Sequence, residues 1–514
     1  ITLWGAGIVV AWAWGMRRLA RFWQPPANGV AKKNRQAWLP VALAWGVGYH
    51  GLALFWITGI HPMTWMGVNW WVSLAIAAFA WSFITLWGAG IVVAWAWGMR
   101  RLARFWQPPA NGVAKKNRQA WLPVLARVLT GIALWCAIES LWSMGSLYWT
   151  SISYTQSPYN LAILHLGQVS GAMTVTAAIV AVNALLAEAW LSAAGSSGER
   201  RSPLVRYAAP IVLCVALHAI GLGLYGRPLN DAPNLALKVG IIQGNIPNTI
   251  KLFEDGWRRS LTHYTDGYQA LADQGVDAVL TPETALPIQW LGELRKRTAF
   301  YQAVVERGIP VWLGAFGGDG RSITNSLFTV AGDGATLSEY RKFKLVPLGE
   351  YIPFEQVLGR LIDRLSPLDA HMIPGRAGQV FDTPFGRAIA AICYESAFPE
   401  VFRYQAASGG QFILTASNNA HYSTTMPAQH HAQDVMRAIE TDRWAARATN
   451  TGYSGIVDPH GRTIWLSGIN TYEIHAGTIY RRQTQTLYVR WGDWLTPLWV
   501  GLAIAALLLQ RRST

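Results

Sequence analysis

Apolar residues run almost without interruption through the first 228 positions and return near the C-terminus, whereas residues 235–490 mix polar and apolar positions like a globular domain. A helix that crosses a bilayer needs about 20 mostly apolar residues. The pattern therefore predicts a multi-span α-helical membrane domain over 38–228, a polar domain over 235–490 and a C-terminal membrane helix over 493–509. The individual predicted spans are residues 1–16 (short), 38–60, 73–98, 121–143, 160–192, 207–226 and 493–509.

Basic connectors between the apolar runs predict how the chain is oriented. They are "MRRLARFW" and "AKKNRQA" within 99–120, "GERRSPLVR" at 198–206 and the terminal "QRRST". Lys and Arg concentrate in the cytoplasmic loops of membrane proteins. Counting helices from these loops places 61–72, 144–159 and the whole polar domain on the opposite, extracytoplasmic side.

Composition agrees with a membrane protein. Of the 514 residues, 52% are hydrophobic and only 14% are charged, whereas a soluble protein carries about a quarter charged residues. The net charge of +15 comes partly from the basic loops. Because the chain has no base-stacking motif and no basic recognition helix, this charge does not indicate nucleic-acid binding.

Residues 1–41 recur letter for letter at 84–124. A structural repeat drifts in sequence, so perfect identity indicates a very recent duplication or an error in assembling the sequence. The chain also starts at Ile1 and not at Met. We expect the first copy to be an artefact or a truncated N-terminus, and we assign it no function.

The polar domain changes periodicity. Helical spacing occupies 256–275 and 294–308, between segments with the character of buried strands. Strands that alternate with helices predict an α/β layered domain, and such domains place reactive groups at strand ends. The predicted strand segments are 237–246, 276–283, 309–318, 325–332, 387–396 and 411–420.

Three reactive side chains stand in unusual sequence at or beside these strands, namely Glu283, Lys342 and Cys393. A thiolate is a strong nucleophile, but a free thiol is mostly protonated at neutral pH. A carboxylate can take the thiol proton, and an ammonium can stabilise a developing oxyanion. The set is therefore complete for acyl transfer through a thioester. The alternatives are a surface ion pair between Glu283 and Lys342 and a buried, inert cysteine.

Disulfide bonding does not account for Cys393. The other two cysteines, Cys136 and Cys214, lie in the apolar runs, so the polar domain holds no second thiol.

Four phrases, "TPETALP", "YRKFKLVPLGEYIPF", "ICYESAFPE" and "LTASNNA", resemble the carbon–nitrogen hydrolase (nitrilase) superfamily in their order and rough spacing. The resemblance implies an α-β-β-α sandwich. It also implies that Glu283 is the general base, Lys342 the stabiliser of the tetrahedral oxyanion and Cys393 the nucleophile.

Further residues match the superfamily pattern. Glu350 matches an additional essential carboxylate, and Tyr394 and Glu395 match the residues that flank the nucleophile, with supporting or substrate-binding roles. The segments "QGNIPNTIK" (243–251) and "ITNSL" (323–327) also fit.

The phrase "KLVPLGEYIPF" and the flanking membrane helices make the chain similar, from about residue 43 onward, to the N-acyltransferases of bacterial lipoprotein maturation. This likeness implies a fatty acyl chain carried from a membrane phospholipid, as a Cys393 thioester, to the N-terminal amine of diacylglyceryl-cysteine in an apolipoprotein. It implies a multi-pass protein of the bacterial inner membrane with a periplasmic catalytic domain. The implied partners are the phospholipid donor, the apolipoprotein acceptor and the bilayer, with no cofactor.

Two segments depart from the pattern of these N-acyltransferases. His421, Tyr422 and Ser423 follow "SNNA" where Trp-Phe-Gly is usual, and Leu252-Phe253 stand where a tryptophan is usual. Both segments are expected near the entrance for the acyl chain, so they bear on substrate preference more than on chemistry.

Histidines do not indicate a metal site. His430 and His431 are adjacent, and His421 is nearby, but no Cys or carboxylate stands at ligand spacing with them. We therefore expect no bound metal.

Glu139, in "ALWCAIESLWSMG", is a carboxylate within an apolar run. An acid inside a membrane is costly and is a candidate for function. The alternative is that it pairs within the helical bundle near the outer face, and the sequence leaves both possibilities open.

Two rival functions are a membrane-tethered amidase or nitrilase that hydrolyses small amides, and a transporter or scaffold whose outer domain is catalytically inactive. Several spans, where one anchor would suffice, argue against the tethered amidase. The intact set of Glu, Lys and Cys argues against the inactive scaffold.

Overall fold

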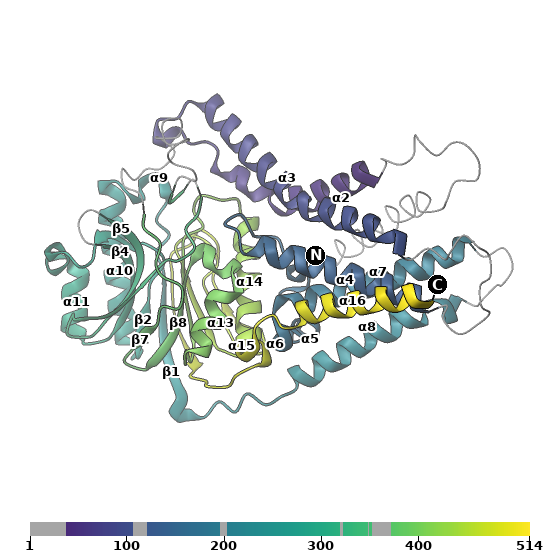
Figure 1. Cartoon of the computed structure of the whole chain (residues 1–514). Coiled ribbons are helices and arrows are strands. Elements are labelled where there is room, and N and C mark those ends of the chain that lie inside the picture. Colours follow the sequence, from purple (N-terminus) through teal and green to yellow (C-terminus); the bar gives the residue numbers. More distant parts are fainter. Residues whose placement is uncertain are drawn as a thin grey trace.

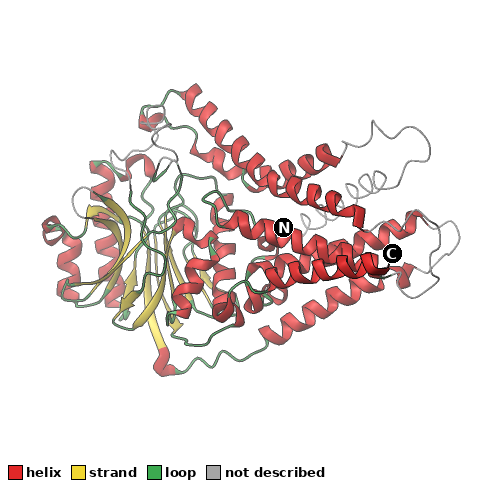
Figure 2. Ribbon diagram, viewed as in Figure 1, coloured by secondary structure: helices red, strands yellow, loops and turns green. Residues whose placement is uncertain are grey.

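A helical bundle and a two-sheet sandwich make up the chain in the computed structural model (Figures 1 and 2). The structure describes residues 38–105, 121–195, 203–318, 322–347, 349–351 and 372–513. The predicted span at 1–16 and nearly all of the first repeat copy therefore lie outside the described residues.

The bundle contains long apolar helices. Within the described residues, α3, α4, α7 and α8 are long and apolar enough to cross a membrane. The helices of the bundle are α2 (Trp38–Ala53), α3 (Trp70–Leu102), α4 (Leu122–Ser143), α5 (Leu161–Leu164), α6 (Gly167–Ser170), α7 (Ala172–Gly195), α8 (Pro203–Tyr225) and α16 (Leu495–Ser513).

Two predicted spans are divided in the structure. The segment 38–60 is helical only to Ala53, and a 3₁₀ helix, η1 (Phe55–Ile60), follows. The segment 160–192 begins with α5 and α6 and then breaks at Gly171, which has φ +74°. A Cβ at this glycine would lie 2.5 Å from the Tyr488 ring. Both the backbone angle and the close packing therefore require glycine at the break.

Two sheets form the sandwich. The first has the order β13-β1-β2-β4-β5-β6, with β3 paired to β4, and the second has the order β12-β11-β10-β9-β8-β7. The strands are β1 (Ala236–Gln243), β2 (Ala278–Leu280), β3 (Leu286–Gln289), β4 (Val311–Gly318), β5 (Ile323–Val330), β6 (Thr336–Arg341), β7 (Phe381–Thr383), β8 (Gly386–Ile392), β9 (Ile413–Ser417), β10 (Ala445–Thr449), β11 (Gly455–Val457), β12 (Thr463–Leu466) and β13 (Glu473–Tyr480).

Helices cover the outer face of each sheet, which confirms the predicted α-β-β-α sandwich (Figure 1). The helices α10 (Glu254–Asp273) and α11 (Ala299–Arg307) pack on the first sheet. The helices α13 (Pro399–Ala407) and α14 (Thr425–Thr441) pack on the second sheet, on the side of the bundle. Short helices α9 (Asn248–Lys251) and α15 (Leu487–Trp491) complete the described part of the domain.

The two-residue periodicity of β8 determines which layer each side chain joins. Ala388, Ala390 and Ile392 lie in the core between the sheets, together with alternate residues of β1. Ile389 and Ala391 face the other way and pack with α13 and α14. Both faces of β8 are therefore buried, and the strand is rigidly held up to the residue that precedes Cys393.

The predicted helix at 294–308 is two elements. A 3₁₀ helix, η6 (Glu293–Arg297), precedes α11. Thr298 caps α11, because its hydroxyl accepts a hydrogen bond from the Tyr301 N–H at 3.2 Å. Such a cap begins a new helix, so the helical spacing of this segment did not correspond to one continuous helix.

The sandwich is packed directly onto the bundle. One hydrophobic core joins Trp56 of η1 and Trp149 of the loop after α4 to Val435 and Ile439 of α14. The side-chain oxygen of Gln429 accepts hydrogen bonds from the Trp56 indole at 3.1 Å and the Trp149 indole at 2.7 Å. The η1 helix after α2 and the loop after α4 therefore lie at the same end of the bundle as the polar domain.

Candidate active site

Strand ends carry the three predicted reactive residues. Glu283 follows β2, Lys342 directly follows β6, and Cys393 directly follows β8 as the first residue of the 3₁₀ helix η7 (Cys393–Ala397). Cys393 has φ +52°, a backbone conformation that is strained for any residue with a side chain. Strained backbone of this kind gathers at functional sites, where the surrounding structure maintains it.

Lys342 lies between two carboxylates. Its Nζ donates hydrogen bonds to Oε1 of Glu283 and Oε1 of Glu350, each at 2.9 Å. Asn325 donates from Nδ2 to the same two oxygen atoms, at 2.7 and 2.8 Å. The second oxygen of Glu350 accepts from the backbone N–H of Val346 at 2.8 Å. The ammonium and both carboxylates are thus fixed in place by charge-assisted hydrogen bonds.

These contacts determine the protonation states at rest. Burial opposes ionisation of Glu283, but the charge and hydrogen bond of Lys342 outweigh burial and lower the pKa of that carboxyl. Burial likewise opposes a charged Lys342, but Glu283 and Glu350 outweigh it and raise the Lys342 pKa. Burial and the negative charge of Glu283 raise the pKa of Cys393 to about 12. The resting site therefore holds a carboxylate, an ammonium and a neutral thiol.

Glu395 connects the Cys393 turn to the segment that carries Lys342. This fully buried carboxylate accepts hydrogen bonds from the Ile392 N–H at 2.7 Å and from the Phe343 N–H at 2.7 Å. The Tyr340 hydroxyl donates to both of its oxygen atoms at 3.0 Å. Glu395 thus supports the nucleophile and the ammonium together.

Tyr394 connects the same turn to the bundle. Its hydroxyl donates to the backbone oxygens of Ser146, at 2.7 Å, and Tyr148, at 3.1 Å. Its ring stacks on Trp149 with the centroids 6.0 Å apart. The residue next to the nucleophile is therefore held by the loop that follows α4.

Glu139 takes part in the same loop. It is fully buried in α4 and accepts hydrogen bonds from the Trp135 indole at 2.7 Å, the Tyr148 hydroxyl at 3.0 Å and the Ser151 hydroxyl. The sequence left open whether Glu139 has a function or pairs within the helical bundle. The observed contacts are those of a residue that pairs within the bundle. Its pairing partners hold the loop that in turn holds Tyr394.

Two residues near the site had no predicted role. Asn325 bridges Glu283 and Glu350, as described above, and Lys251 donates from Nζ to the backbone oxygen of Glu283 at 3.0 Å. Both lie in segments that matched the superfamily, "ITNSL" and "QGNIPNTIK". The match singled out both segments, but it did not identify Asn325 or Lys251 individually.

The histidines pair with protein groups. A ring nitrogen of His430, Nε2, lies 2.7 Å from the backbone oxygen of Cys393, and the other, Nδ1, lies 3.1 Å from Asn419 Nδ2. His431 Nε2 lies 2.9 Å from the Thr463 hydroxyl. His421 and Tyr422 lie against the bundle, where Tyr422 packs edge-on to Trp56. Among the described residues, no group of three His, Cys, Asp or Glu could hold a metal.

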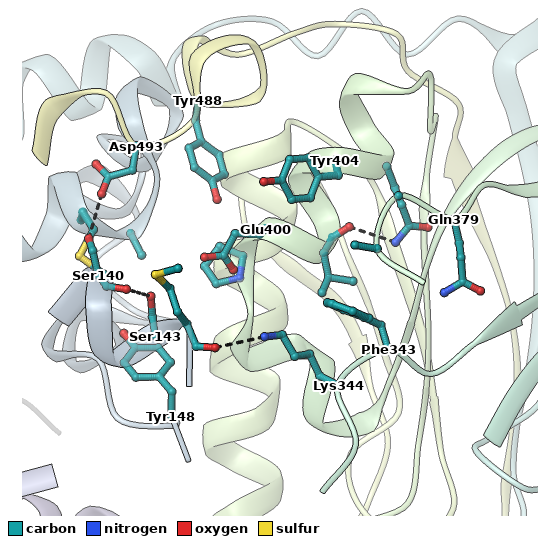
Figure 3. A pocket seen from close by; sticks show the side chains of 18 of the residues that line it. Ser140, Ser143, Tyr148, Phe343, Lys344, Gln379, Glu400, Tyr404, Tyr488 and Asp493 are labelled. Atoms are coloured by element: carbon teal, nitrogen blue, oxygen red, sulfur yellow. Dashed lines mark hydrogen bonds between the residues drawn. The ribbon is translucent and has the colours of Figure 1, made fainter. Parts of the chain in front are cut away.

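A cavity of about 450 Å³ lies at the junction of the bundle and the sandwich (Figure 3). Ser140 and Tyr148 line one wall, and Phe343, Lys344 and Tyr404 line the other. Lys344 reaches across and donates from Nζ to the backbone oxygen of Met144 at 3.4 Å. None of the three predicted reactive residues lines this cavity, so it is distinct from the candidate active site.

Comparisons with known proteins cover both parts of the chain. Residues 238–487 match the carbon-nitrogen hydrolase family, and residues 5–185 match the apolipoprotein N-acyltransferase N-terminal domain. Among solved structures, an amidase from Nesterenkonia sp. is 19% identical, with 53% of this chain and 98% of that chain covered and a TM-score of 0.39.

Curated relatives match most of the chain. The apolipoprotein N-acyltransferase of Nostoc sp. is 60% identical over 90% of this chain and 88% of its own length. The protein of the same name from Synechocystis sp. is 50% identical over 91% of this chain and 89% of its own. With this identity over nearly the full length, and with both domains matched, the chain belongs to the apolipoprotein N-acyltransferase family.

Proposed function

We propose that this membrane enzyme transfers a fatty acyl chain from a phospholipid to the N-terminal amine of diacylglyceryl-cysteine in apolipoproteins. The observation that carries the proposal is the buried Lys342, which contacts Glu283 and Glu350 at 2.9 Å each beside a cysteine held to the membrane bundle through Tyr394. Family membership supports the same reaction, since the named relatives are apolipoprotein N-acyltransferases.

In the first half-reaction Glu283 accepts the thiol proton as Cys393 attacks the ester carbonyl of the phospholipid. A new S–C bond forms, and the negative charge that develops on the carbonyl oxygen faces the Lys342 ammonium. The ester C–O bond then breaks, and Glu283 returns the proton to the departing glycerol oxygen. The products are a Cys393 thioester and a lysophospholipid.

In the second half-reaction the neutral α-amine of the lipoprotein attacks the thioester carbonyl. The amine loses a proton to Glu283, the C–S bond breaks, and the thiol recovers the proton. An amide is left on the acceptor. Glu350 and Asn325 keep the Lys342 ammonium and the Glu283 carboxylate in fixed positions during both steps. Tyr394 and Glu395 support the turn that presents Cys393.

The test of the proposed function is to incubate the purified chain with labelled phospholipid and then add a diacylglyceryl peptide. We expect intact-mass spectrometry to show one acyl chain on the enzyme, which disappears as an N-acylated peptide forms. Release of free fatty acid without peptide acylation would indicate a hydrolase, and an unmodified enzyme would indicate an inactive scaffold. Rescue of a strain depleted of its own N-acyltransferase tests the same activity in cells.

We further propose that the chain lies in the bacterial inner membrane with residues 235–490 on the periplasmic side. The last turn of α3 carries Arg100 and Arg101. The guanidinium carbon of Arg511, in α16, lies 4.3 Å from the centroid of the Phe105 ring, so the end of α16 is next to the end of α3. Basic residues thus gather at the end of the bundle away from the sandwich (Figure 1). By the positive-inside rule that end is cytoplasmic.

Protease added to spheroplasts tests this orientation. We expect residues 235–490 to be digested from outside and the basic segment 99–120 to be cut only after the membrane is permeabilised. Protection of the sandwich in intact spheroplasts would reverse the orientation.

A further inference from the structure

Lys251 has a buried ammonium group next to Glu283, the predicted base. The mechanism described above gives this lysine no role. Its side chain is at the end of α9, the residue is only 4% exposed, and its Nζ donates to the backbone oxygen of Glu283 at 3.0 Å. Glu283 and Glu350 direct their carboxylates to Lys342 instead. Within the part of the chain that the structure describes, no carboxylate forms an ion pair with Lys251, so the negative charge of Glu283 acts on this ammonium only without direct contact.

Burial lowers the pKa of Lys251 to about 8, against the opposing pull of the Glu283 carboxylate. The Lys251 side chain is therefore still mostly protonated, and so positively charged, at neutral pH. A buried charge is costly unless it is paired, and a single carbonyl oxygen leaves two of its three N–H donors available. An apolar residue would fill this position at lower cost if packing were its only role.

A second residue on the same short helix, Asn248, also has an unused hydrogen-bond donor. The Nδ2 atom of Asn248 is buried and makes no hydrogen bond among the described residues. Its Oδ1 accepts from Asn418 Nδ2 at 3.0 Å, and the backbone oxygen of Asn418 lies 3.7 Å from the Cys393 Sγ. Lys251 thus contacts Glu283 directly, Asn248 is linked to Cys393 through Asn418, and both offer donors to an anionic ligand.

The next two residues of the chain show what kind of anion would fit. Leu252 and Phe253 are 36% and 53% exposed. A cation beside exposed apolar side chains suits a phosphate that is part of a lipid better than a free phosphate ion.

We propose that Lys251, with Asn248, binds the headgroup phosphate of the phospholipid acyl donor. This inference rests on the proposed function. An ester carbonyl that Cys393 attacks must face Lys342, and the glycerol backbone places the phosphate of the same molecule only a few bonds away. Lys251 is the neighbouring ammonium, and neither Glu283 nor Glu350 forms an ion pair with it, because both carboxylates contact Lys342. It would therefore select a donor with a phosphate and position its ester at the thiol.

The experiment compares two acyl donors on the full-length chain and its Lys251→Met variant. One donor is dioleoyl phosphatidylglycerol in mixed micelles, and the other is p-nitrophenyl palmitate, an ester without phosphate. For Lys251→Met we expect kcat/KM of enzyme acylation by the phospholipid to fall roughly 10- to 100-fold, the range for a lost charge-assisted hydrogen bond. Acylation by the neutral ester should keep the parent rate, which also shows that the variant is folded.

Lys251→Arg should retain most of the preference for the phospholipid, and Asn248→Ala should lose a smaller part of it. The matched control is Lys238→Met on β1, because Lys238 also donates from Nζ to a backbone oxygen, that of Gln274. This variant should behave as the parent does with both donors.

Three outcomes separate the possibilities. If Lys251→Met slows both donors equally, the lysine acts through Glu283 and the phosphate site is wrong. If the variant slows neither donor, the lysine has no role in acylation and the inference also fails. If the parent itself takes no acyl chain from phospholipid, the proposed function fails before this inference is reached.

Discussion

Cys393→Ser abolishes acyl transfer and leaves no acyl-enzyme, while the protein stays folded in the membrane. A hydroxyl is nearly the same size as the thiol but holds its proton far more tightly, and burial beside Glu283 already raises the thiol pKa to about 12. Glu283 therefore cannot generate the alkoxide, and we expect transfer to fall on the order of 10⁴-fold or more, as for loss of a nucleophile elsewhere. The measurement is intact-mass spectrometry after incubation with phospholipid.

The controls for this substitution are Cys136→Ser and Cys214→Ser, which remove the other two thiols. Both should form acyl-enzyme as the parent does. Detection of the acyl chain on Cys136 or Cys214 in the parent would contradict the assignment of Cys393.

Glu283→Gln keeps the shape of the side chain and should stop acyl-enzyme formation at neutral pH, because the amide cannot accept the thiol proton. The amide oxygen can still accept hydrogen bonds from Lys342 and Asn325, which in the parent protein donate to Glu283 at 2.9 and 2.7 Å. The substitution also removes a negative charge that raises the Cys393 pKa. Raising the pH should therefore partly restore acylation, since solvent can remove the thiol proton.

Loss of Lys342 should have a different pH dependence. Lys342→Met alone leaves Glu283 and Glu350 as two buried carboxylates that share Asn325, and one of them would take up a proton. The double variant Lys342→Met with Glu350→Gln removes that complication. This double variant lacks the cation that faces the oxyanion, so we expect the rate of acyl-enzyme formation to fall roughly 100- to 1000-fold. Alkaline pH should restore this rate much less than it restores the rate of Glu283→Gln.

The measurement is the rate of acyl-enzyme formation from phospholipid between pH 6 and pH 10. The parent, Glu350→Gln and the two variants are compared in the same detergent. If Glu283→Gln and the double variant both acylate at the parent rate, the charged cluster is structural and the mechanism is wrong.

The sequence predicted those parts of the fold that depend on local pattern. The six predicted strand segments overlap β1, β2, β4, β5, β8 and β9, because runs of small and β-branched residues specify buried strands. The strands β3, β6, β7 and β10 to β13 were not predicted. The two-part structure of 160–192 was also missed, since the break at Gly171 depends on the Tyr488 ring more than 300 residues further along the chain.

The candidate site divides in the same way. Glu283, Lys342 and Cys393 were predicted because each stands in unusual local sequence, and the structure places each of them after the end of a strand. Lys251 and Asn325 were not found individually, because their roles come from contacts with residues 32 and 42 positions away. The partners of Glu139 were likewise invisible, since Tyr148 and Ser151 lie in the loop beyond the helix.

The pairing of β1 with β13 has a consequence for protein engineering. Ala236, where the chain enters the sandwich, is paired with Tyr480, where it leaves. Antiparallel partners lie about 4.5–5.5 Å apart, so the whole sandwich is an insertion whose two attachment points are neighbours. Another domain with adjacent termini could be grafted at the same place, provided that it covers the apolar surface that Trp56 and Trp149 of the bundle present to α14.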